Sequence, residues 1–269
     1  MMIFDINQAL IWTENLLAIA LLVQSTELLR ISSYPSFQSI WSLENLKADF
    51  YPIFIFPKPL IHFLFSISGF RLILMGIFTL AVGSFFYSPF MVYFFIGILH
   101  ILVNMRFRGN FNGGSDTMTF VIISGLCIAN FSDSENVKKI GLIYIGIHGL
   151  YSYFKAGLAK VRHADWRTGK AISQFLHYGV LNPKSRFIKT IENNAPLHFF
   201  LSWATLCFEL GIIILLFAPR FTLFYALLAA AFHLAVFFMF GLNRFFWIWL
   251  AAWPGIATLV TTWTRSYNL

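Results

Sequence analysis

The stretch FTLFYALLAAAFHLAVFFMF, residues 221–240, decides the fold class. It contains no Lys, Arg, Asp or Glu, and a helix of about 20 mainly apolar residues crosses roughly 30 Å of hydrocarbon. Lipid offers the backbone no hydrogen-bond partner, so an open apolar run of this length spans a membrane only as a helix. The sequence therefore predicts a transmembrane helix here, interrupted by one ionisable group, His233.

Composition extends this conclusion to the whole chain. Of the 269 residues, 58% are apolar, 19% are aromatic and only 11% are charged, against about 25% charged in an average soluble protein. Two cysteines exclude a disulfide scaffold, and no nucleic-acid-binding motif accompanies the net charge of +8. We predict an all-α, polytopic membrane helical bundle that forms one domain over residues 1–269.

Apolar runs predict about eight transmembrane helices, near residues 9–29, 71–87, 89–107, 117–131, 137–161, 196–217, 221–240 and 245–263. A further apolar stretch, residues 51–70, contains three prolines that would break a helix near its start, so we predict a re-entrant or interfacial segment there. With eight spans, most of the 19 Lys and Arg residues fall on the side of the loop 162–194. The positive-inside rule places that side in the cytoplasm.

The fifth predicted span carries the most unusual polar pattern. His148, Ser152, Lys155 and Ala159 share one helical face, and Lys160 follows directly. An ionisable side chain at bilayer depth costs at least about 2.5 kcal/mol. Burial in an apolar site disfavours the ammonium form of lysine and makes it a base near neutral pH. Lys155 and Lys160 are therefore candidate functional residues; the alternative is that both extend to the membrane interface.

Glu209 and His233 lie on consecutive antiparallel spans, each about ten residues from the turn at 218–221. We expect them to meet at similar depth. Their pairing would either join two helices by a hydrogen bond or serve as a proton relay or ligand contact. The seven histidines form no array with metal-ligand spacing, so no metal site is expected.

The segment NFNGGSD, residues 110–116, directly precedes a predicted span. Its two glycines permit a tight turn, and Asp116 can cap the helix that follows. A second interpretation is that Asn112, Gly113 and Gly114 expose backbone amides that, together with Asp116, hold a polar substrate group or a quinone carbonyl.

Three segments, in this order, resemble the HTTM (horizontally transferred transmembrane) family, which includes vitamin K-dependent gamma-carboxylase and sporulation-delaying protein B. They are NGGSD at 112–116, YFKAGLAKVRHADWRTGKAISQFL at 153–176, and the Phe-Glu and Phe-His pairs at 208–209 and 232–233 before a Phe- and Trp-rich final span. The resemblance covers about residues 90–255. It implies that Lys160 matches the lysine that acts as the base in the carboxylase, and that Asp165 and Trp166 match the Asp-Trp that follows that lysine.

The chain departs from the carboxylase in two places. Gly114 stands where the carboxylase has a histidine, and only six residues follow Trp263, which leaves no large extramembrane domain to capture a propeptide. We therefore expect a separately encoded protein or peptide partner. The carboxylase acts on the luminal side, which corresponds to the bacterial exterior, whereas the charge count puts the Lys160 loop inside. The side that Lys160 faces stays open.

The leading hypothesis is a multi-pass enzyme of the bacterial inner membrane that modifies or matures a peptide or protein. Lys160 would abstract a proton, Asp116 and the glycine turn would orient a peptide or quinol, and Glu209 and His233 would relay protons. The remaining substrate-binding candidates are Asn112, Gly113, Gly114, His148, Lys155, Asp165 and Trp166.

The cofactor is unknown, with a quinol as the candidate. The expected partners are the lipid bilayer and the separately encoded protein or peptide, and not nucleic acid. Two alternatives remain: a non-catalytic membrane subunit whose basic loop docks a partner or anionic lipid, and a quinone- or lipid-binding module without turnover.

Overall fold

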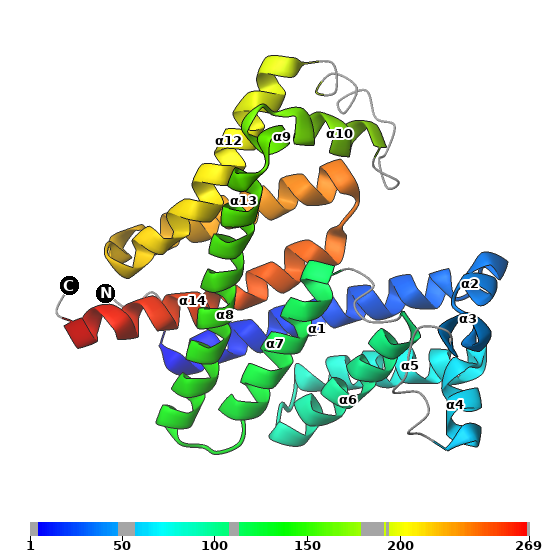
Figure 1. The fold of residues 1–269 in the computed structure, drawn as a ribbon. Helices are drawn as coiled ribbons and strands as arrows, with labels where there is room; N and C mark the ends of the chain where they lie inside the picture. The colour runs from blue at the N-terminus through cyan, green and yellow to red at the C-terminus, as the bar shows by residue number, and fades with distance from the viewer. Residues whose placement is uncertain (1–4, 48–56, 108–112, 179–190, 192–193, 268–269) are drawn as a thin grey trace.

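The regular structure of the chain is helical. The computed structural model describes residues 5–47, 57–107, 113–178, 191 and 194–267, and every regular element among these residues is a helix (Figure 1). The all-α prediction is therefore confirmed.

Long helices lie in all eight segments that the apolar runs predict. They are α1 (Ile6–Ile31), α5 (Ile67–Ser84), α6 (Phe90–Arg106), α7 (Gly113–Ala129), α8 (Glu135–Arg162), α12 (Ala195–Gly211), α13 (Thr222–Phe240) and α14 (Asn243–Tyr267). Two 3-10 turns, η2 (Ile212–Leu216) and η3 (Pro219–Phe221), connect α12 to α13. The other connections contain the short helices α2 (Pro35–Ile40), α3 (Leu43–Lys47), α4 (Lys58–Phe65), α9 (Ala164–Arg167) and α10 (Lys170–Tyr178).

Five segments of the described chain are long and apolar enough to cross a membrane. These are α1, α5, α12 with η2, η3 with α13, and α14. Helices α6 and α7 are apolar but have only 17 residues each, and the 28-residue α8 carries lysines toward both ends. Large apolar side chains on α13, such as Phe224 and Leu227, are more than half exposed, as expected for a surface that faces lipid. The chain is an integral membrane protein with several spans, and the number eight stays a prediction.

The predicted re-entrant stretch is described only from Pro57 onward, because residues 51–56 lie outside the described ranges. There the chain forms α4, which at eight residues is too short to cross a bilayer. Ser66 then adopts an extended conformation, and its hydroxyl accepts a hydrogen bond from the Gly69 backbone nitrogen at 2.9 Å. This cap starts α5 at Ile67, four residues before the predicted span. A re-entrant path stays a prediction.

Arg106 shows how the connecting helices are fixed to the bundle. The sequence places it at the end of a span among the loop charges, yet only 2% of the residue is exposed. Its guanidinium carbon lies 4.7 Å and 4.9 Å from the ring centroids of Phe70 and Phe37. It also donates hydrogen bonds to the carbonyl oxygens of Leu64 and Ser66, both at 3.4 Å. A buried arginine thus joins α2, the end of α4, α5 and α6.

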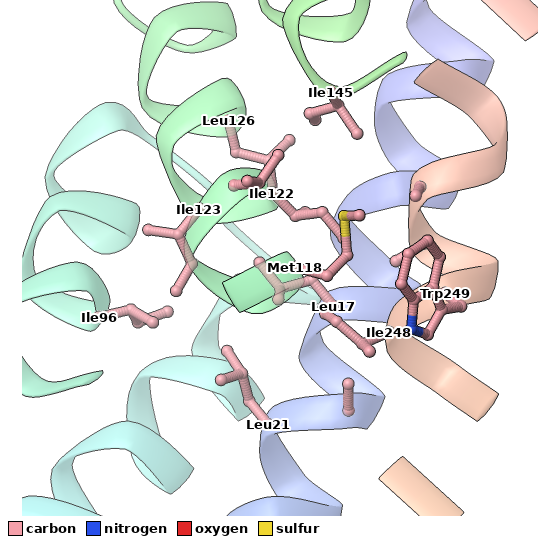
Figure 2. Packing of buried hydrophobic residues seen from close by; sticks show 14 of the residues in the cluster. Leu17, Leu21, Ile96, Met118, Ile122, Ile123, Leu126, Ile145, Ile248 and Trp249 are labelled. Atoms are coloured by element: carbon pink, nitrogen blue, oxygen red, sulfur yellow. The ribbon is translucent and has the colours of Figure 1, made fainter. Parts of the chain in front are cut away.

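Helix α14 occupies the centre of the bundle, where it packs against α1 on one side and α8 on the other. Figure 1 shows α1 and α14 running together while α8 crosses them. The crossing depends on Gly146 of α8, because a Cβ atom there would lie 2.3 Å from the carbonyl oxygen of Gly255. Figure 2 shows the adjoining core, in which Leu17 and Leu21 of α1 lie beside side chains of α7 and α14. This packing fixes the position of α8 and therefore of Lys160.

Candidate functional site

The described residues form a cavity of about 970 Å³. Its lining comes mainly from α7, α8 and α13, with further residues from α9, α10, α12 and the start of α14. The lining is mostly aromatic and aliphatic, and its polar members are few. Those with ionisable or hydroxyl groups are Thr117, His148, Tyr151, Ser152, Tyr153, Lys155, Lys160, Thr205, Glu209 and His233. Such a composition suits a ligand with an apolar body and a small number of polar groups.

Lys160 and Glu209 form an ion pair on the cavity wall. Lys160 lies in the last turn of α8, and its Nζ donates a hydrogen bond to Glu209 Oε1 of α12. The Glu209 side chain is 5% exposed, whereas the Lys160 side chain is 24% exposed. The Lys160 ammonium also lies 5.1 Å from the ring centroid of Trp166. The pair is therefore anchored on the acid side and accessible from the cavity on the lysine side.

Gly157 allows this pair to form. It lies one turn before Lys160, and a Cβ atom at this position would lie 2.9 Å from Glu209 Cβ and 3.0 Å from the Leu210 backbone nitrogen. Only the absence of a side chain lets α8 and α12 approach this closely. The glycine of the Ala-Gly step in the sequence is thus part of the geometry that brings Lys160 to Glu209.

His233 lies in an aromatic cluster on the opposite wall. The Tyr153 hydroxyl of α8 is 2.6 Å from His233 Nε2 of α13, and both residues are buried. The His233 ring stacks on Trp249 of α14, with centroids 5.4 Å apart and an interplanar angle of 13°. Phe245 contacts both rings, at 5.2 Å and 5.8 Å. This packing holds the imidazole in one orientation beside the cavity.

The predicted pairing of Glu209 with His233 is wrong in its partners. In the described structure Glu209 binds Lys160, and His233 binds Tyr153. Both residues do line the same cavity, as their similar depth predicts. The difference arises because α8 lies between the two sites and supplies a closer partner to each.

Asp116 lies behind the cavity wall rather than on it. Its carboxylate forms an ion pair with Arg244 Nη1 at 2.9 Å, and the two side chains are 1% and 9% exposed. His100 Nε2 lies 3.3 Å from the Asp116 backbone oxygen. Glu27 of α1 lies near Asn243 and Arg244. The acid therefore joins α7 to the start of α14, within a polar cluster that also includes α1 and α6.

The glycine turn before Asp116 contributes one lining residue. Gly114 lines the cavity, where a Cβ atom would lie 3.0 Å from Phe245 Cε2. Gly113 is exposed and does not line the cavity, and Asn112 lies outside the described residues. The predicted use of these backbone amides for substrate binding is untested.

The polar face predicted on α8 also borders the cavity. His148, Ser152 and Lys155 are all lining residues, and His148 packs on Tyr144 with ring centroids 4.6 Å apart. Lys155 is exposed, with its Nζ 5.6 Å from the Tyr151 ring centroid. The face therefore opens onto the cavity, although its role in binding is untested.

Trp166 and Asp165, which follow Lys160 in the matching segment, lie in different surroundings. Trp166 lines the cavity, and the Ser202 hydroxyl of α12 donates a hydrogen bond to its carbonyl oxygen. Asp165 is exposed, with its Oδ1 4.0 Å from Lys170 Nζ. Helix α10 then places Ile172 and Phe175 over the end of the cavity. Only Trp166 of the two residues contacts the candidate site.

Three residues of this arrangement were not singled out from the sequence. Tyr153 and Trp249 read as ordinary apolar positions, and Arg244 reads as a loop charge directly before a predicted span. Tyr153, an aromatic residue about two turns from Lys160 on the same helix, carries no distinguishing signal. Arg244 does carry a signal in the sequence. It is a cation directly before one long apolar run, and Asp116 is an acid at the start of another, so the two are candidates for pairing.

Within the described ranges, no group of three or more His, Cys, Asp or Glu side chains is arranged to hold a metal ion. Residues 127–258 match the family model of the HTTM domain. This chain is an HTTM-domain protein. The membership inferred from the three segments is thereby confirmed, and Lys160, Glu209 and His233 all lie inside the matched range, whereas Gly114 and Asp116 precede it. Comparisons with curated proteins and with solved structures found no match.

Proposed function

We propose that this HTTM-domain protein is a membrane enzyme that modifies or matures a peptide or protein partner, with Lys160 as its base. The observation that carries this proposal is the Lys160–Glu209 pair on the wall of a large apolar cavity. For Lys160 to act as a base, its ammonium first passes one proton to the Glu209 carboxylate, which leaves a neutral amine and a neutral acid. The amine then takes a proton from the substrate.

The other lining groups have supporting roles in this proposal. His233, oriented by Tyr153, is the proton relay on the opposite wall. Trp166 packs beside the Lys160 ammonium and shields it from water. Asp116 acts as a positioning residue, since it contacts Arg244 rather than the cavity. A quinol is the candidate co-substrate, because an aromatic lining suits a flat, apolar ring.

The test compares tagged protein purified from its own membranes as wild type, Lys160→Met and Lys160→Arg. Arginine keeps a cation for Glu209 but cannot serve as a base. Lys139→Met is the matched control, because Lys139 lies at the other end of α8 and outside the cavity lining. The readout is the intact mass of every co-purifying peptide, protein and quinone.

We expect a mass-shifted partner with wild type and Lys139→Met, and the unshifted partner with both Lys160 variants. Retention of the shifted product in Lys160→Arg would contradict the base role. A stoichiometric partner of unaltered mass in all four samples would instead identify a non-catalytic membrane subunit.

A second candidate function is binding of a quinone or lipid without turnover. The predominance of aromatic and aliphatic side chains in the lining favours it. It predicts that the same apolar molecule co-purifies with wild type and Lys160→Arg, with no modified partner in either sample.

A further inference from the structure

The charged groups on the cavity wall do not balance. The described lining contains two lysines, Lys155 and Lys160, and one acid, Glu209. Glu209 is already bound by Lys160. No acidic side chain in the described part of the chain pairs with Lys155, whose recorded contact is the Tyr151 ring at 5.6 Å. An unpaired ammonium beside a mainly apolar cavity requires an anion or water as its partner.

The two lysines border one continuous surface. Eight residues of α8 line the cavity, and at about 100° per residue they cover roughly half of the helix circumference. Lys155 lies near one edge of this surface and Lys160 near the other. Ser152, Ala156 and Ala159 lie between them, and their small side chains leave room above the helix. A ligand lying across these residues would reach both lysines.

Two buried N–H groups on the opposite wall also require an acceptor. With the Tyr153 hydroxyl donating to His233 Nε2, the neutral imidazole carries its proton on Nδ1. His233 Nδ1 and Trp249 Nε1 are buried and have no hydrogen-bond partner among the described residues. Both side chains line the cavity. These two nitrogens and the Lys155 ammonium therefore call for acceptors on the ligand.

We infer that the cavity binds an anionic amphiphile, whose carboxylate or phosphate head pairs with Lys155 and whose apolar body lies over Ala156 and Ala159 toward Lys160 and His233. This ligand carries an anionic head that the candidate quinol lacks, and the inference rests on the proposed function only for what happens at Lys160. An anion at Lys155 neutralises the unpaired charge, the aromatic lining covers the apolar body, and a carbonyl or ether oxygen along that body accepts from His233 or Trp249.

The test is photo-crosslinking of the purified full-length protein in uncharged detergent. Three probes share one diazirine-bearing alkyl chain and differ only in the head: a carboxylate, a phosphate monoester and a primary alcohol. Labelled positions are mapped by peptide mass spectrometry. We expect the two anionic probes to label residues 148–160 and 232–249 about tenfold more strongly than the alcohol, which is the effect of one ion pair on binding. The stronger of the two anionic probes identifies the source, a fatty acid or a phospholipid-like head.

Variants of Lys155 connect the preference to this side chain. Lys155→Gln is expected to reduce anionic labelling to the level of the alcohol, whereas Lys155→Arg and the control Lys139→Gln retain the preference. Equal labelling by acid and alcohol in wild type, or an unchanged preference in Lys155→Gln, would overturn the inference and make Lys155 a side chain that reaches the membrane interface. If inorganic phosphate abolishes labelling by the anionic probes, the site binds a free anion. The inference that its ligand is an amphiphile would then be wrong.

The outcome is separable from that of the proposed function, because labelling needs no turnover. If Lys160→Arg retains the product while anionic labelling still depends on Lys155, the base role is wrong and the ligand class stands. If Lys160→Arg abolishes the product while acid and alcohol label equally, the base role stands and the ligand class is wrong.

Discussion

Two ion pairs in this protein each join one acidic and one basic side chain, but their surroundings differ. We call Asp116–Arg244 the enclosed pair and Lys160–Glu209, which borders the cavity, the accessible pair. Asp116 and Arg244 connect α7 to α14, with side chains that are 1% and 9% exposed. Lys160 and Glu209 connect α8 to α12, and the Lys160 side chain is 24% exposed on the cavity wall. Arginine remains charged in proteins, whereas lysine can release its proton when its surroundings change. The first pair can only hold helices together, and the second can also exchange a proton.

The packing is denser around Asp116 and Arg244 than around Lys160 and Glu209, which border the cavity. Around Asp116 and Arg244, helices α1, α7 and α14 form the dense core of Figure 2. Glu14, beside Asn130 at the opposite end of α7, is also fully engaged, since its oxygens accept from Ser88 at 3.0 Å and Asn130 at 2.9 Å. Glu209 keeps one buried oxygen without a hydrogen-bond partner in the described structure. The cavity that adjoins Lys160 and Glu209, and not Asp116 and Arg244, therefore makes the accessible pair the functional candidate.

The largest effect is expected from breaking the enclosed pair. Arg244→Met leaves the Asp116 carboxylate buried without its cation, which typically costs about 3–5 kcal/mol. We expect a large fall in the melting temperature of the purified protein in detergent. Arg265→Met, at an exposed position near the end of the same helix, is the control and is expected to melt like wild type.

The double variant Asp116→Asn, Arg244→Met sharpens this test. Removing the charge of the acid as well as the base removes most of the penalty, so the double variant should melt above Arg244→Met. If Arg244→Met and wild type melt at the same temperature, the pair contributes nothing to the bundle and the contrast between the two ion pairs fails.

A smaller effect is expected from separating α8 and α12. Gly157→Ala places a methyl group against Glu209 Cβ and the Leu210 backbone nitrogen. Overpacking of this kind costs about 1–3 kcal/mol, and it also moves Lys160 away from Glu209. Gly83→Ala is the control, since a Cβ atom there meets no atom within 4 Å. The measurements are the melting temperature and the mass of the product. If Gly157→Ala has wild-type values of both, the close approach of α8 to α12 at Gly157 is not required.

The fold was predictable because each long apolar run had one stable solution in lipid. Residues 221–240 formed α13, and the other seven runs also formed helices. The errors lie at the ends of helices, where local hydrogen bonds decide. Helix α5 begins at Ile67 because Ser66 caps it, a contact that a hydropathy pattern does not contain.

The candidate site was predictable in its members and not in its contacts. Lys160, Glu209 and His233 stood out because each is ionisable within an apolar run. Their partners depend on how α8 crosses α14 at Gly146 and approaches α12 at Gly157, and such a crossing is a property of three helices together. Arg244 was assigned to a loop for the same reason: its burial depends on Asp116, which lies more than a hundred residues earlier.

The accessible pair should tolerate loss of its cation better than the enclosed pair does. In Lys160→Met the Glu209 carboxyl can take up a proton and become neutral, so we expect a stability loss of about 1–2 kcal/mol, below that of Arg244→Met. Product formation should nevertheless be abolished. Melting curves of the two variants, recorded side by side with product masses, give the comparison. A Lys160→Met protein that melts as low as Arg244→Met would show that both pairs are structural.

The smallest change in stability is expected for Tyr153→Phe. It removes the 2.6 Å hydrogen bond to His233 but keeps the ring, which packs against Trp249 at 4.7 Å and Phe208 at 5.4 Å. The loss of one such hydrogen bond costs about 1 kcal/mol. The imidazole, however, loses the hydrogen bond that holds its orientation, so product formation should fall more than the melting temperature implies. Tyr87→Phe, at a residue that is 75% exposed, is the control. If Tyr153→Phe retains full product formation, His233 does not depend on Tyr153 for its role. The Tyr153–His233 contact would then be structural, like the enclosed pair Asp116–Arg244.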